Sequence, residues 1–209
     1  ANTEWQRDLS VSQNKIGDVL LAQGDGPAAL TAYRASLTIR ERLAARDPAN
    51  TEWQRDLSVS HNKIGDVLLA QGDGPAALTA YRAALAIAER LAARDPANTE
   101  WQRDLSVSHI KIGDVLLAQG DGPAALTAYR ASQTIFQTLA ARDPDNTEWQ
   151  RDLCVSHSKL GVQARRAGQT ADARAHFQIG RDIMTRLVKL DHTNAQWKRD
   201  LVWLDAQLK

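Results

Sequence analysis

The stretch that decides the fold of this chain is Ile16-Gly17-Asp18-Val19-Leu20-Leu21-Ala22-Gln23-Gly24-Asp25-Gly26-Pro27. It recurs unchanged from Ile64 and from Ile112, and in a diverged form from Leu160. Each copy therefore begins 48 residues after the one before it. A fixed period of this size is typical of an array of repeated structural units.

The remaining sequence follows the same period of 48 residues. All six prolines and five of the six tryptophans fall on positions that this period relates. We therefore divide the chain into four units, 1–48, 49–96, 97–144 and 145–192, followed by a half unit at 193–209. The whole of 1–209 is expected to form a single domain of stacked repeats.

Each unit reads as a pair of α-helices. In the first helix, Asn2 or Thr3 is a suitable N-cap, and Gly24 supplies the left-handed residue that ends the helix. Pro27 suits the first turn of the second helix, which ends before Pro48. Apolar residues follow helical spacing in both helices: Trp5, Leu9, Ile16, Val19 and Leu20 in the first, and Ala29, Leu30, Tyr33, Leu37, Ile39 and Leu43 in the second. No stretch alternates like a strand, so the predicted class is all-α.

Composition excludes several classes of function. The 26 basic and 25 acidic residues leave a formal net charge of +1, which argues against a nucleic-acid partner. No apolar run is long enough to cross a membrane, and no secretion signal is visible, so no membrane partner is expected. The single cysteine, Cys154, excludes a disulfide framework and favours a cytoplasmic protein.

The repeated stretch resembles the tetratricopeptide repeat (TPR). The family pattern has a Leu-Gly pair, an Ala twelve residues after that Gly, and an aromatic residue four further on. Gly17, Ala29 and Tyr33 reproduce these spacings in the first unit, and the other three units keep them. Asp47-Pro48-Ala49-Asn50 also looks like the linker between such repeats. The resemblance implies a TPR-like α-solenoid of helix-turn-helix hairpins wound into a right-handed superhelix.

The unit differs from the family in its length. A TPR unit has about 34 residues, whereas this one has 48, which adds roughly two turns to each helix. Seven residues make nearly two helical turns, so the buried face stays in phase. The groove of the superhelix is expected to differ from the usual one in width and pitch.

Residues that could carry out chemistry have structural explanations. His61, His109 and His157 share one repeat position, and such positions lie about 10 Å apart in stacked helices, too far to hold one zinc ion. Cys154 has no activating base beside it in sequence. The tryptophan ladder lies on the apolar stripe, which favours core burial over stacking against bases. We therefore expect no enzyme activity, no cofactor and no bound metal.

The TPR resemblance implies a protein or peptide partner on the concave face, which is lined by the first helix of each unit. The positions carried over are Val11, Asn14, Lys15, Asp18, Leu21, Val59, Asn62, Lys63, Asp66, Leu69, Ile110, Lys111, Asp114, Leu117 and Lys159. The lysines among them would bind carboxylates in the manner of the clamps of some family members. Alternatively, Lys15 and Asp18 lie three residues apart and would pair with each other on a solvated face.

The two ends of the chain carry different patterns. The fourth unit is more polar than the others, and 193–209 has one apolar stripe, which predicts a capping helix at a natural C-terminus. The first unit keeps an apolar face, which predicts that further repeats or another domain precede it and that this end self-associates weakly. The leading hypothesis is a protein-interaction scaffold. The alternative is a structural spacer or self-association arm of a larger protein, with no ligand in its groove.

Overall fold

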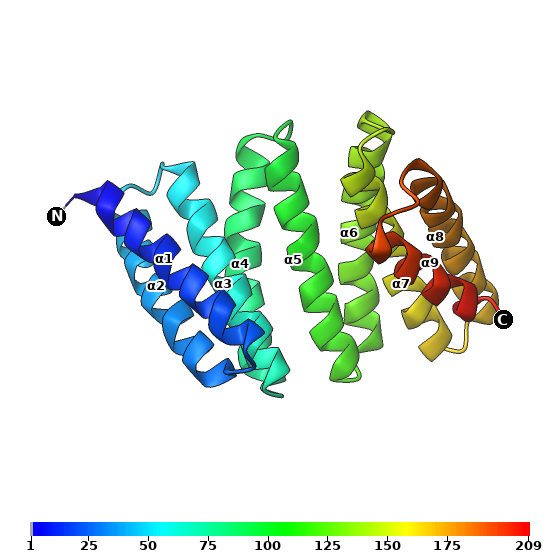
Figure 1. Cartoon of the computed structure of the whole chain (residues 1–209), viewed down its shortest axis with the longest axis horizontal. Coiled ribbons are helices and arrows are strands. Elements are labelled where there is room, and N and C mark those ends of the chain that lie inside the picture. The colour runs from blue at the N-terminus through cyan, green and yellow to red at the C-terminus, as the bar shows by residue number, and fades with distance from the viewer. Residues whose placement is uncertain (1) are drawn as a thin grey trace. The chain divides into compact units, whose positions relative to one another are not determined.

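The computed structural model describes residues 2–209, in which nine α-helices and no strands are present (Figure 1). The chain divides into two compact units, one ending at Val115 and the other running from Leu116 to Lys209. The first unit contains α1 (Thr3–Ala22), α2 (Gly26–Arg46), α3 (Thr51–Ala70), α4 (Gly74–Arg94) and most of α5 (Thr99–Ala118). The second contains α6 (Gly122–Arg142), α7 (Thr147–Arg166), α8 (Thr170–Leu190) and α9 (Ala195–Gln207). Odd-numbered helices are called A helices below, and even-numbered ones B helices.

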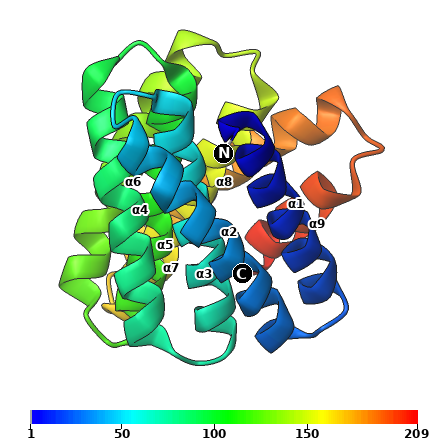
Figure 2. The same ribbon diagram turned by 90° about the vertical axis from the view of Figure 1, so that its left-hand side faces the viewer.

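Local signals in the sequence set the ends of the helices. The Asn2 side chain accepts hydrogen bonds from the backbone N–H groups of Glu4 and Trp5, which identifies it as the N-cap of α1. Gly24 adopts a φ of +84° directly after α1, a left-handed conformation that favours glycine. Asp25 then caps α2 by accepting from Ala28 N–H. The predicted helix pair is confirmed, and Figure 2 shows α1 and α2 side by side with their short connecting loop.

The two helices of a hairpin approach closely where the sequence has small residues. Ala29 and Tyr33 of α2 are fully buried. A Cβ atom on Gly17 would lie only 2.5 Å from Cε1 of the Tyr33 ring, so glycine is required there. The same register is held by the hydroxyl of Ser36, which donates to the backbone carbonyl of Ser10 at 2.8 Å. These contacts explain why Gly, Ala and Tyr recur at fixed spacing.

The apolar stripe predicted for the A helix faces a neighbouring repeat rather than its own B helix. On α3, Ile64 and Val67 are buried because α2 packs against this face. On α1 the equivalent Ile16 and Val19 are about half exposed, at 48% and 57%. The prediction that this stripe is core in every unit is therefore wrong for α1. What α1 buries against α2 is Ser10, Asn14 and Gly17.

The tryptophan ladder also departs from the prediction of core burial. Trp5 is 73% exposed on α1. Its four equivalents are half-buried: Trp53, Trp101, Trp149 and Trp197. The first turn of the A helix lies at the rim of the repeat, where the neighbouring B helix covers only part of an indole ring.

The second unit has a core centred between α7, α8 and α9. Phe177, Met184 and Leu204 are almost completely buried, together with Cys154. The Cys154 thiol donates to the carbonyl of Gly180 at 3.4 Å, and burial raises its pKa to about 12. Cys154 is thus a buried thiol in the α7–α8 contact, with α9 packed beside it through Leu204.

Candidate functional site

The surface expected to bind a partner is formed in the first unit by α1, α3 and the part of α5 up to Val115. We call it the A-helix surface. The predicted residues that are exposed or half-buried on these helices are Val11, Lys15, Asp18, Leu21, Val59, Asn62, Lys63, Asp66, Leu69, Ile110, Lys111 and Asp114. Leu117 and Lys159 are half-buried in the second unit, on α5 and α7. These two residues are therefore described apart from the surface.

Lysine and aspartate side chains join successive A helices of this surface. Lys63 Nζ lies 2.6 Å from Asp18 Oδ1, and the Tyr33 hydroxyl donates to the same oxygen at 2.6 Å. Burial raises the pKa of Asp18, but the hydrogen bonds from Lys63 and Tyr33 outweigh it and hold the pKa below its usual value. Asp18 therefore pairs with the lysine of the next repeat and not with Lys15 of its own helix.

The same arrangement occurs one repeat later. Lys111 Nζ lies 2.5 Å from Asp66 Oδ1, to which the Tyr81 hydroxyl donates at 2.7 Å. The ammonium group of Lys111 also lies over the Tyr81 ring, 5.4 Å from its centroid. Each rung is thus a neutral unit of one cation, one anion and one phenol. The lysine ladder does not present bare positive charge at these two positions.

A second ladder of ion pairs links the first turns of the A helices. Arg7 pairs with Glu52 at 2.7 Å and with Asp56 at 2.9 Å. Arg55 pairs with Glu100 and Asp104 in the same register, at 2.8 and 2.5 Å. The two ladders balance charge along the helices, which explains why the near-neutral composition is repeated in every unit.

The asparagine position differs between the first two repeats. Asn14 is only 8% exposed and lies between α1 and α2. With its amide nitrogen towards Ser36 it donates to that hydroxyl and accepts from Arg40, at distances of 3.0 and 3.1 Å. Asn14 therefore does not belong to the A-helix surface, contrary to expectation. Asn62 is half-buried on α3, and its Oδ1 atom is shielded from solvent without a hydrogen-bond partner.

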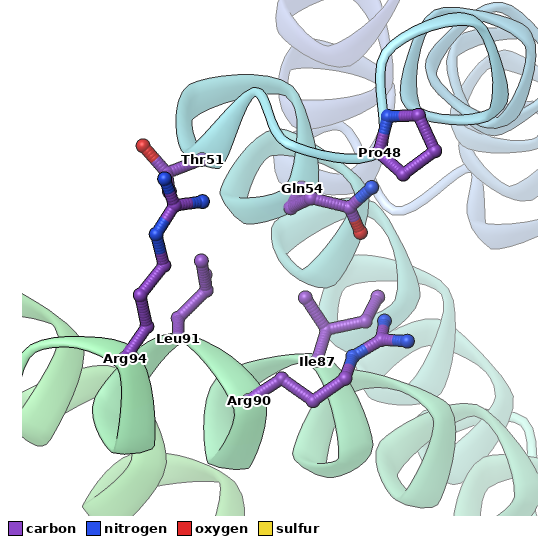
Figure 3. A pocket seen from close by; sticks show the side chains of 7 residues that line it. All are labelled: Pro48, Thr51, Gln54, Ile87, Arg90, Leu91 and Arg94. Atoms are coloured by element: carbon purple, nitrogen blue, oxygen red, sulfur yellow. The ribbon is translucent and has the colours of Figure 1, made fainter.

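A shallow cleft of about 200 Å³ lies on another side of the first unit (Figure 3). Arg90 and Arg94 extend from α4 on either side of Leu91, and the linker residue Pro48 lies across from them. Arg94 donates to the backbone carbonyl of Ala49 at 2.8 Å, which ties it to the linker. The sequence gave no motif for this cleft, because it depends on how the linker crosses α4.

Two searches of the described residues bear on the excluded functions. No group of three or more His, Cys, Asp or Glu side chains within residues 2–209 is arranged to hold a metal ion. None of the helices in this part of the chain combines the length and hydrophobicity that a membrane span requires.

The comparison with protein families gives matches along the chain. One tetratricopeptide repeat model matches residues 10–49 and 60–97, and a second matches 110–131. No curated protein matches the sequence. The TPR resemblance inferred from Gly17, Ala29 and Tyr33 is thereby confirmed.

Solved structures show the same fold. BtubC (BKLC) from P. vanneervenii is 16% identical, with a TM-score of 0.69 over 86% of this chain and 64% of that one. This chain thus spans slightly less than two thirds of that protein. A structure with nearly identical TPR-like repeats, named as a kinesin light chain of Podosopora anserina, is 14% identical. It has a TM-score of 0.63 over 97% of this chain and 95% of that one. Repeats of this kind generally mediate protein–protein interaction and are not themselves enzymes.

Proposed function

We propose, from the premise that this chain is a tetratricopeptide-like repeat protein, that it is an interaction scaffold whose A-helix surface binds a segment of another protein. The observation that carries the proposal is the combination of neutral rungs and unsaturated polar groups on this surface. Lys63 and Asp18 neutralise each other, whereas the Oδ1 atom of Asn62, one residue away, has no partner.

The chemistry of the surface indicates what kind of segment would bind. Because the lysines of the rungs are paired, a ligand gains little from negative charge alone. The unpartnered Asn62 oxygen would accept a hydrogen bond from a backbone N–H of the ligand, which removes the cost of leaving it unsatisfied. Val59 and Leu69 lie half-buried on the same helix and would contact apolar side chains. An extended or helical peptide with apolar anchors fits these features.

The experiment is a peptide selection on the immobilised full chain, followed by fluorescence anisotropy with the selected peptide. Two variants place on α3 a residue that occupies the equivalent position elsewhere in the chain. Asn62→Ile introduces the counterpart of Ile110, and Leu69→Arg introduces the counterpart of Arg165. We expect each to weaken binding about tenfold or more, as truncations of central interface residues do.

A matched control comes from the opposite side of the hairpin. Ala86 is exposed on α4, and Ala86→Thr introduces the counterpart of Thr38. This control should leave the affinity unchanged. The proposal is refuted if no peptide is selected, or if all three variants bind the selected peptide as the unmodified chain does.

A second candidate role, self-association, is favoured by the outer face of α1. Trp5, Leu9, Ile16 and Val19 are between 48% and 73% exposed on this face, although their equivalents Ile64 and Val67 are buried. A contiguous apolar face of this kind is typical of an interaction surface. We propose that a second copy of the chain covers it.

The charges of α1 support a two-fold contact between copies. Asp8 lies near the beginning of the helix and Lys15 lies seven residues later on nearly the same side, and both are exposed. Antiparallel packing of two α1 helices would set Lys15 of each copy near Asp8 of the other. Sedimentation velocity should show a dimer that forms with concentration and disappears in Ile16→Lys. Val202→Lys, at an exposed residue of α9, should leave the dimer intact. A monomer at all concentrations contradicts this role without affecting peptide binding.

A further inference from the structure

Two histidines of the fourth repeat meet between α7 and α8. His157 Nδ1 lies 3.0 Å from His176 Nδ1, and the two ring centroids are 5.2 Å apart. Gln133 of α6 places its amide 3.3 Å from His157 Nε2 and 3.5 Å from His157 Nδ1. Three helices of the second unit therefore bring three side chains with nitrogen or oxygen donors to one point.

This cluster occurs once among the repeats of the described chain. His61 and His109 occupy the position of His157 in the second and third repeats. Ala80 and Ala128 stand where the fourth repeat has His176. The residues equivalent to Gln133 are leucines, Leu37 and Leu85. In near-identical repeats, packing at these positions is met by alanine and leucine, so packing alone does not account for the second histidine and the glutamine.

We propose that His157 and His176 bind one divalent copper or nickel ion through their Nδ1 atoms. Metal–imidazole bonds are about 2.0–2.1 Å long, so nitrogens 3.0 Å apart subtend an angle of roughly 90° at the metal. That angle belongs to square-planar, tetragonal or octahedral coordination, which Cu²⁺ and Ni²⁺ adopt, and is smaller than the tetrahedral angle that zinc prefers. The Gln133 amide, turned so that its oxygen faces the rings, supplies a third donor, and water completes the coordination.

The protonation states suit a metal at this point. His157 is 4% exposed, and burial together with the neighbouring His176 lowers its pKa to about 4, so its ring is neutral at pH 7. Without metal, one Nδ1–H donates to the other Nδ1. Binding requires that this proton move to Nε2 of its own ring, so that both Nδ1 lone pairs face the ion and no net proton is released. His176 is half-buried and opens the pair to solvent.

Charged groups around the pair act in opposite directions. Asp172 lies one turn before His176 on α8 and favours a cation. Arg130 lies one turn before Gln133 on α6 and disfavours one. The charge beside the site is thus balanced, and the affinity rests on the two imidazoles.

The test is titration of the full chain with Cu²⁺ at pH 7.5, monitored by calorimetry and by electron paramagnetic resonance. We expect one bound ion per chain, with superhyperfine splitting from two nitrogen ligands. Ni²⁺ should compete for the same site. Binding of more than one equivalent with no nitrogen splitting would overturn the proposal.

Three variants identify the ligands, and each introduces a residue that another repeat already has. His176→Ala matches Ala80, and His157→Gln matches Gln13, so both are expected to fold, as circular dichroism will verify. Each should weaken Cu²⁺ binding at least about tenfold and remove one nitrogen coupling. His61→Gln is the matched control and should change neither. Retention of the wild-type affinity and spectrum in folded His176→Ala would refute the site.

Discussion

Lys63 Nζ lies 2.6 Å from Asp18 Oδ1, so the ion pair joins two A helices separated by a full repeat. The two side chains are 37% and 47% exposed, and Tyr33 also donates to Asp18. The pair therefore lies in a partly solvated position on the surface proposed to bind a partner. Its geometry makes Lys63 a link between repeats first, and a ligand contact only through its remaining hydrogens.

A double-mutant cycle on this pair should give a small coupling energy. Exposed ion pairs contribute about 0.2–1 kcal/mol, because water screens both charges. We expect Lys63→Met and Asp18→Asn to show a coupling in this range in urea unfolding at low salt, falling at 1 M NaCl. A coupling above about 2 kcal/mol would mean that the pair is far less solvated than its exposure indicates.

Gly17→Ala should destabilise the protein, although alanine favours helix by about 1 kcal/mol over glycine. The new Cβ would lie 2.5 Å from the fully buried Tyr33 ring, and overpacking of this kind costs about 1–3 kcal/mol. Urea unfolding measures the change. Gly122→Ala is the control, because the nearest side-chain atom to its Cβ is 3.8 Å away, and it should not destabilise. Equal effects of the two substitutions would contradict the close approach.

Arg40 is a buried cation between the first two repeats, and its replacement should depend on volume. It is 4% exposed and donates to the Asp56 carbonyl at 2.6 Å and to the Ser60 hydroxyl at 3.0 Å. Arg40→Ala should cost about 2–4 kcal/mol, because it leaves a cavity and unpaired acceptors. Arg40→Met should cost about 1 kcal/mol or less, since Met184 fills the equivalent place in the fourth repeat. If both cost the same in urea unfolding, the hydrogen bonds outweigh the packing.

The helices could be predicted from sequence because their signals are local. Asn2, Gly24 and Pro27 each act within one turn of chain, and a period of 48 residues repeats each signal along the chain. Burial was harder to predict, because it depends on which neighbour covers a face. Ile16 and Ile64 have the same local sequence, yet one is 48% exposed and the other 6%.

The candidate sites were predictable only in part, for the same reason. The spacing of Lys15 and Asp18 suggested a pair within one helix, whereas the structure joins Asp18 to Lys63, 45 residues away. The histidine ladder was visible in the sequence, but it drew attention to His61 and His109 rather than to His176. The signal that could have found the pair is the departure of the fourth repeat from alanine at that position.

Acidification should destabilise the first unit through His61 and His109. Burial lowers the pKa of both imidazoles, while Glu41 and Glu89 act to raise them more weakly. The unfolded chain therefore binds more protons than the folded one as the pH falls below about 6.5, so stability is full above that pH and is lost below it. Replacing both with glutamine, the residue at position 13, removes this loss. Urea unfolding at pH 7.5 and 5.5 should show His61→Gln/His109→Gln gaining about 1 kcal/mol or less over the unmodified chain at the lower pH. A relative loss of stability by the variant on acidification would mean that the folded state favours the charged imidazoles.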